Sequence, residues 1–142
     1  MGLDWGKKNI GVAISDPLGL TAQPLTVIKR SNLQKDIQRI RELCHEYEVE
    51  ELVIGYPLNM DASRSEVAEQ VEQFKHRLLQ LLPFKVHLWD ERLTSTRAEQ
   101  TLLEADVSRE KRKLSRDKLA ASMILESFIR ARSVDREEVE EE

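Results

Sequence analysis

Residues 2–17 read GLDWGKKNIGVAISDP, and this stretch decides the fold. Every second residue from 10 to 14 is isoleucine or valine, which is typical of a strand with one buried face. Residues 2–6 form a short apolar strand before it, and a turn begins at Asp16. Residues 23–29 are rich enough in β-branched side chains for a third strand. Because the connections are short, we expect these strands to pair antiparallel as a meander.

Two amphipathic helices are predicted next, each beginning at a capping box. In this motif a serine or threonine and a glutamate or glutamine three residues later satisfy the first free amides of a helix. The pairs are Ser31 with Gln34 and Ser63 with Glu66. Apolar stripes at helical spacing follow each pair and end near residues 47 and 81.

Two compact apolar segments, residues 51–56 and 85–89, alternate with these helices and are predicted to be strands. Strands that are separated by helices run parallel through right-handed crossovers. The three-strand antiparallel meander and these two parallel strands predict an α/β protein with a mixed five-stranded sheet and flanking helices.

The C-terminal third is predicted to be helical and to end in a tail. A capping box at Thr96 predicts a third helix, a basic linker follows it, and a last helix capped by Ser115 reaches to about residue 129. We therefore place one domain at residues 1–132. Residues 133–142 should form an acidic, solvated and mobile tail.

Length and composition exclude several classes of protein. At 142 residues the chain is one ordinary domain, and 40% apolar with 34% charged residues is typical of a globular protein. No apolar stretch approaches the ~20 residues of a membrane span, and the first residues lack the pattern of a secretory signal. The single cysteine, Cys44, excludes an internal disulfide. We expect a cytoplasmic protein with no membrane partner.

The net charge of −4 conceals two opposite regions. Residues 135–142 hold six acids and one base, so the remaining chain has 26 − 6 = 20 acids and 22 − 1 = 21 bases. Within it, residues 109–118 hold six bases and two acids. The overall acidity therefore does not exclude a nucleic-acid partner.

Four acids stand at the ends of predicted elements: Asp4 in the first strand, Asp90 and Glu91 after the fifth, and Asp117 at the start of the last helix. Aspartate is uncommon in strands, and an unpaired buried carboxylate is costly. Each acid also has an ordinary explanation. Asp4 could cap a turn with Gly6, and Asp117 could interact with the helix dipole. Asp90 and Glu91 could belong to an ordinary strand-end turn or form a local salt bridge with Arg92.

Together the four acids predict a metal site. If the first and fifth strands lie close in the sheet, their carboxylates converge at the edge where α/β proteins bind ligands. Clustered carboxylates need cations, and oxygen ligands select Mg²⁺ or Mn²⁺. Two such ions about 3.5–4 Å apart activate water and stabilise the leaving oxygen of a phosphodiester. The basic stretch at 109–118 would hold the phosphate backbone.

Seven short motifs, in order along the chain, resemble the YqgF (RuvX) family of the RNase H-like superfamily. Each motif is weak alone, whereas the ordered set is specific. The resemblance implies an RNase H-like fold and a metal-dependent endonuclease that processes the 5′ end of precursor 16S rRNA in ribosome biogenesis. The motifs are residues 2–7 (GLDWGK), 10–13 (IGVA), 15–17 (SDP), 53–57 (VIGYP), 90–94 (DERLT), 111–113 (KRK) and 117–121 (DKLAA).

By position, the resemblance implies that four residues are catalytic: Asp4, Asp90, Glu91 and Asp117. It also implies that three of them, Asp4, Glu91 and Asp117, are ligands of two Mg²⁺ or Mn²⁺ ions. Which of Asp90 and Glu91 faces the ions stays open, because adjacent strand residues point to opposite faces. A run of bases is also typical of a solvated surface. The candidate phosphate-binding residues are Lys7, Asn59, Arg92, Lys111, Arg112 and Lys113.

Two positions depart from the family pattern. Asn9 stands where arginine is usual, so one phosphate contact is lost, and Arg116 precedes Asp117 where an apolar residue is usual. Neither departure removes a proposed metal ligand. In the loop after the fourth strand, Asp61 and Ser63 could touch the substrate, although Ser63 is better explained as a helix cap.

Two alternative functions remain open from the sequence. Resolution of a Holliday junction in DNA needs two active sites and so a symmetric dimer, whereas one cut in RNA needs only a monomer. A non-catalytic RNA-binding accessory would not need the acids. A phosphotransferase of the actin and sugar-kinase superfamily shares the Asp-x-Gly opening, but it is excluded because ATP would require a second such domain.

Overall fold

The computed structural model describes residues 1–93 and 109–141, with side chains of the last helix described from 115 to 134. The helix predicted at Thr96 lies outside the described residues. The described elements, in chain order, are β1 (Gly2–Trp5), β2 (Asn9–Ser15), β3 (Ala22–Lys29), α1 (Leu33–Glu46), β4 (Glu51–Tyr56), α2 (Glu66–Leu81), β5 (Lys85–Asp90), the short 3₁₀ helix η1 (Glu91–Leu93) and α4 (Arg109–Glu141).

The strands form one five-stranded sheet in the order β3-β2-β1-β4-β5. β1 pairs antiparallel with β2, and β2 pairs antiparallel with β3, which is the predicted meander. β4 pairs parallel with both β1 and β5. The predicted mixed sheet is therefore confirmed, and β1 and β5 are separated by one strand only.

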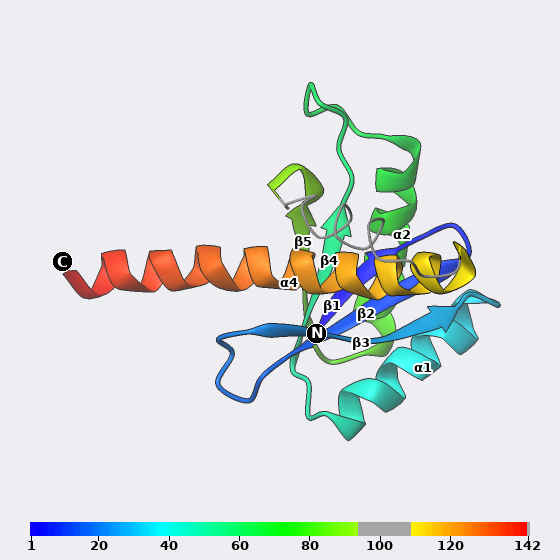
Figure 1. The fold of residues 1–142 in the computed structure, drawn as a ribbon, viewed down its shortest axis with the longest axis horizontal. Helices are drawn as coiled ribbons and strands as arrows, with labels where there is room; N and C mark the ends of the chain where they lie inside the picture. The colour runs from blue at the N-terminus through cyan, green and yellow to red at the C-terminus, as the bar shows by residue number, and fades with distance from the viewer. Residues whose placement is uncertain (94–108, 142) are drawn as a thin grey trace.

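The two faces of the sheet are covered by different helices. On one face, large apolar side chains from β1, β2 and β4 pack against α1 and α2, with Phe74 fully buried among them. On the other face α4 packs against small residues, and Figure 1 shows it crossing in front of the strands and projecting beyond them. Because side chains alternate along a strand, Leu3 faces α1 and α2 whereas Asp4 faces α4.

Glycines let the backbone of α4 lie directly on the strands. A Cβ atom on Gly2 would lie 2.8 Å from the carbonyl oxygen of Ala121, and one on Gly11 would lie 2.5 Å from the carbonyl carbon of Asp117. Both distances are shorter than real Cβ contacts allow. The middle of α4 is therefore positioned by the absence of side chains at these two strand positions.

Both predicted serine caps are wrong by one or two residues. Asn32 caps α1, its side chain accepting from the backbone N–H of Lys35 at 2.9 Å, and the backbone N–H of Ser31 donates instead to the buried Asp36 at 3.1 Å. Ser65 caps α2, accepting from the N–H of Ala68 at 3.0 Å. Asparagine and serine are comparably good caps, so the local sequence does not show which of several nearby polar residues begins the helix.

The predicted basic linker is also wrong, because residues 109–118 belong to α4. The helix neither begins at Ser115 nor ends near residue 129, and it runs on to Glu141. Residues 109–141 contain no glycine or proline and are rich in good helix formers, which explains its length. A mobile tail and a domain boundary at residue 132 stay predictions. None of the described helices is long and apolar enough to cross a membrane.

Candidate active site

The carboxyl ends of β1, β4 and β5 bring Asp4 and Glu91 together. A Cβ atom on Gly55 in β4 would lie 2.5 Å from Oε1 of Glu91, so the glutamate side chain lies over that glycine. Leu3 pairs with Ile54 in the β1–β4 ladder, so Asp4 and Gly55 are the next positions along the two strands. The side chains of Asp4 and Glu91 are hydrogen-bonded to each other.

The environment of Glu91 disfavours its negative charge. Burial raises the pKa of Glu91 above its usual value, and repulsion from Asp90 raises it further, whereas the hydrogen bond with Asp4 acts in the opposite direction. A bound cation would offset the repulsion between these neighbouring carboxyl groups. A carboxyl pair of this kind fits a hard divalent metal ion, for which oxygen atoms are the preferred ligands.

Asp117 approaches the same region from α4. The side-chain amide of Asn9 donates from Nδ2 to Oδ2 of Asp117 at 3.3 Å, which links β2 to the helix. Gly11, on which the Asp117 backbone lies, is the Cα partner of Asp4 in the β1–β2 ladder. Asp117 therefore lies beside the strand that carries Asp4. It is not in the first turn of α4, so the helix dipole does not explain its presence.

The three carboxylates do not form a closed metal-binding cluster. Among the side chains that the structure describes, at residues 1–93 and 115–134, no group of three or more histidine, cysteine, aspartate or glutamate residues has the geometry of a metal site. The structure brings Asp4 and Glu91 together and places Asp117 on Gly11, beside the strand that carries Asp4. A metal ion would be held first by the Asp4–Glu91 pair.

Asp90 forms a salt bridge with Arg92. Arg92 donates from Nε to both Asp90 oxygens at 3.0 Å and from Nη2 to Oδ2 at 2.7 Å. These hydrogen bonds hold the pKa of Asp90 below its usual value. Trp89 packs with the α4-facing cluster, so the alternation of side chains places Asp90 on the other face. Glu91, the first residue of η1, lies over Gly55 beside Ile124 of α4.

The predicted phosphate-binding residues are dispersed. Lys7 is exposed in the β1–β2 turn, and Asn59 donates to the hydroxyl of Ser63 at 2.9 Å inside the loop after β4. Arg92 joins that loop to the site, because its Nη1 donates to the carbonyl of Met60 at 3.3 Å. The remaining three lie on α4 near its N-terminus, and their side chains are outside the described set: Lys111, Arg112 and Lys113.

Sequence reasoning missed three residues that shape the site: Asn9 as a partner of Asp117, and Gly11 and Gly55 as contact points for other elements. A glycine inside a strand pattern often marks a close approach by another segment, and this signal was present at both positions. Nothing local indicated that Asn9 binds Asp117, because the two are 108 residues apart.

Comparison with known proteins matches the whole domain. The family "RuvX: Holliday junction resolvase" matches residues 1–131. A protein of Clostridium botulinum strain Alaska E43 is 48% identical over 91% of this chain and 94% of its own length, and one of Natranaerobius thermophilus is 51% identical over 91% and 92%. Both are named "Putative pre-16S rRNA nuclease".

Solved structures show the same fold. Thermus thermophilus RuvC in complex with a Holliday junction substrate superposes with a TM-score of 0.53 at 19% identity, covering 93% of each chain. A second structure of RuvC from that organism gives a TM-score of 0.50 at 18% identity, covering 93% of this chain and 94% of that one. The expected RNase H-like fold is confirmed by these neighbours.

Proposed function

This chain belongs to the RuvX family, and we propose that it is a metal-dependent endonuclease that processes the 5′ end of precursor 16S rRNA. The observation that carries the proposal is the placement of the Glu91 side chain over Gly55, beside Asp4, at the carboxyl edge of the sheet. The names of its relatives supply the substrate. Such a role in ribosome biogenesis would be carried out in the cytoplasm.

Each residue has a separate part in the proposed chemistry. Asp4 and Glu91 would hold Mg²⁺ or Mn²⁺, and Asp117, kept in place by Asn9, would complete the site once metal or substrate is bound. Two such ions would supply an activated water and stabilise the leaving oxygen of the phosphodiester. Arg92 neutralises Asp90 next to Glu91 and joins the β5 end to the loop that carries Asn59. The bases of α4 would attract the phosphate backbone.

A test of this proposal compares matched carboxylate variants. Asp4→Asn and Glu91→Gln should abolish cleavage of a precursor 16S rRNA fragment in Mg²⁺, because each removes a metal-binding charge. Asp90→Asn is the control, since Asp90 is held by Arg92 and should be less sensitive. Mg²⁺ should also raise the Tm of the wild type and not that of Asp4→Asn. Undiminished cleavage in excess chelator would show that the mechanism is wrong.

A four-way DNA junction is the second candidate substrate. It is favoured by the family description and by the fold shared with RuvC, whose structure holds such a junction. Cleavage of RNA and junction DNA measured in parallel separates the two. Paired nicks by a homodimer would support the junction, cleavage of RNA by a monomer would support the proposal, and binding of RNA without cleavage in any divalent metal would indicate an accessory protein.

A further inference from the structure

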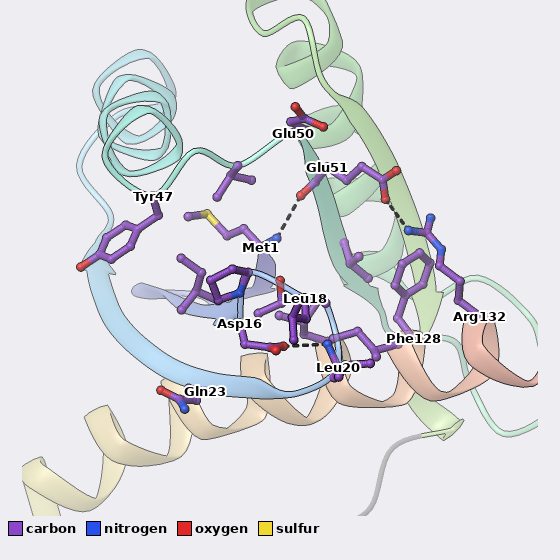
Figure 2. A pocket seen from close by; sticks show the side chains of 18 of the residues that line it. Met1, Asp16, Leu18, Leu20, Gln23, Tyr47, Glu50, Glu51, Phe128 and Arg132 are labelled. Atoms are coloured by element: carbon purple, nitrogen blue, oxygen red, sulfur yellow. Dashed lines mark hydrogen bonds and ion pairs between the residues drawn. The ribbon is translucent and has the colours of Figure 1, made fainter.

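A cavity of about 850 Å³ lies at the end of the sheet opposite to Asp4 and Glu91. Figure 2 shows it between the β2–β3 loop, the segment that joins α1 to β4, and the middle of α4. Its size is within the range of about 300–1,000 Å³ that is usual for binding pockets. The proposed nuclease chemistry makes no use of this region.

Part of the cavity wall is apolar. Ile14, Val49 and Phe128 are half-buried and line it. Beside them, the β2–β3 loop carries two leucines that face solvent, with Leu18 79% and Leu20 67% exposed. Single exposed apolar residues are common on protein surfaces, but a leucine pair next to an apolar cavity forms a continuous surface of the kind that binds partners.

The loop that carries these leucines is held in one conformation. Oδ1 of Asp16 accepts from the backbone N–H groups of Leu20 at 2.6 Å and Thr21 at 2.7 Å, and Gly19 has a positive φ of 69° that closes the turn. These bonds hold the pKa of Asp16 below its usual value. An ordered loop loses little further entropy when it binds, so the exposed leucines are prearranged for contact.

The rim of the cavity has uncompensated negative charge. Glu51 is paired with Arg132 at 2.8 Å, and Arg130 is paired with Glu126 at 2.7 Å. Glu48 and Glu50 also line the cavity and are exposed, and within the part of the chain that the structure describes neither is in an ion pair. The occupant that complements this rim carries positive charge.

We propose that this surface, which we call the loop groove (Leu18, Leu20, Phe128, Glu48 and Glu50), binds a protein segment that combines a bulky apolar side chain with lysine or arginine. The apolar side chain would enter the cavity against Phe128, and the basic groups would meet the two glutamates. Because the groove lies at the far end of the sheet, a partner bound there leaves Asp4 and Glu91 accessible. This inference does not depend on nuclease activity.

Two other occupants fit less well. RNA would be repelled by the unpaired glutamates of the rim. A second copy of the chain would place the same negatively charged rims against each other in a symmetric contact, because isologous interfaces bring one patch against itself. The experiment distinguishes binding of RNA and binding of a second copy from binding of the proposed protein segment.

The experiment titrates ¹⁵N-labelled full-length protein with a synthetic peptide of alternating lysine and leucine. The expected result is movement of the amide signals of Gly19, Leu20 and Ile129, which line the cavity. The double variants Leu18→Ser/Leu20→Ser and Glu48→Lys/Glu50→Lys should each weaken binding about tenfold or more. Matched controls are Leu79→Ser and Glu42→Lys, which change an exposed leucine and an exposed glutamate on α2 and α1 and should bind as the wild type does.

Several results would overturn the proposal. It is wrong if the peptide fails to bind, if either groove variant binds as tightly as the wild type, or if a glutamate–leucine peptide binds equally well. A short RNA that moves the same amide signals would reassign the groove to nucleic acid. A concentration-dependent dimer in light scattering that Leu18→Ser/Leu20→Ser abolishes would reassign it to a second copy.

Discussion

Replacing Gly11 with alanine should inactivate the proposed site without unfolding the protein. A Cβ atom at this position would lie 2.5 Å from the carbonyl carbon of Asp117 and 3.1 Å from the amide nitrogen of Lys118. The carbonyl oxygen of Asp117 would lie closer still, and ordinary contact begins at 3.4 Å, so the helix backbone must move by at least 3.4 − 2.5 = 0.9 Å. Because the obstructing atoms belong to the helix backbone, rotation of a side chain cannot relieve the clash.

The displacement of α4 should affect activity more than stability. A misplacement of about 1 Å in a catalytic group can lower the rate by about 10²-fold. Overpacking in a well-packed region costs about 1–3 kcal/mol. We therefore expect Gly11→Ala to be folded by circular dichroism, moderately less stable to urea, and about 10²-fold slower on precursor RNA under Mg²⁺.

The matched control is Gly19→Ala. Gly19 has a positive φ and open space around it, so alanine there strains the backbone of a distant loop without touching α4. The Gly19→Ala variant should have a free energy of unfolding about 1 kcal/mol lower than the wild type and should cleave RNA at the wild-type rate. If Gly11→Ala is folded and cleaves as fast as the wild type, the position of Asp117 on α4 has no part in catalysis.

Three further predictions concern stability and reactivity. Ser65→Ala should lower the free energy of unfolding by about 1 kcal/mol, because it removes the cap of α2, whereas Ser63→Ala should cost less; urea denaturation of both variants measures the difference. Cys44 should react with a thiol reagent at neutral pH only when the protein unfolds, because burial raises the pKa of its thiol to about 11; labelling at the rate of a free thiol in native buffer would contradict this. Asp16→Ala should destabilise the β2–β3 loop at neutral pH and not in acid. The pKa of Asp16 is lowered in the folded state, so its contribution is present above the unfolded pKa and is lost as the pH falls through the folded one; hydrogen exchange of the Leu20 amide at both pH values tests this.

The local elements could be predicted because their signals are local. The alternation of isoleucine and valine in residues 9–15 and the compact segment at 51–56 predicted β2 and β4 with the observed bounds. Helix starts were predicted less well, since Asn32 and Ser65 are caps of the same quality as the serines chosen. The start of α4 was missed because a basic run is compatible with both a linker and a helix.

The sequence by itself determined the order of the strands and helices, the class of the sheet and the acids worth considering, because side-chain periodicity and turn chemistry act between near neighbours. Tertiary structure alone decided that Glu91, and not Asp90, meets Asp4, since only the folded sheet brings the ends of β1 and β5 together on either side of β4. It also placed Asp117 on Gly11 and formed the loop groove from three separate segments. These features require contacts between residues that are far apart in the chain, which periodicity does not encode.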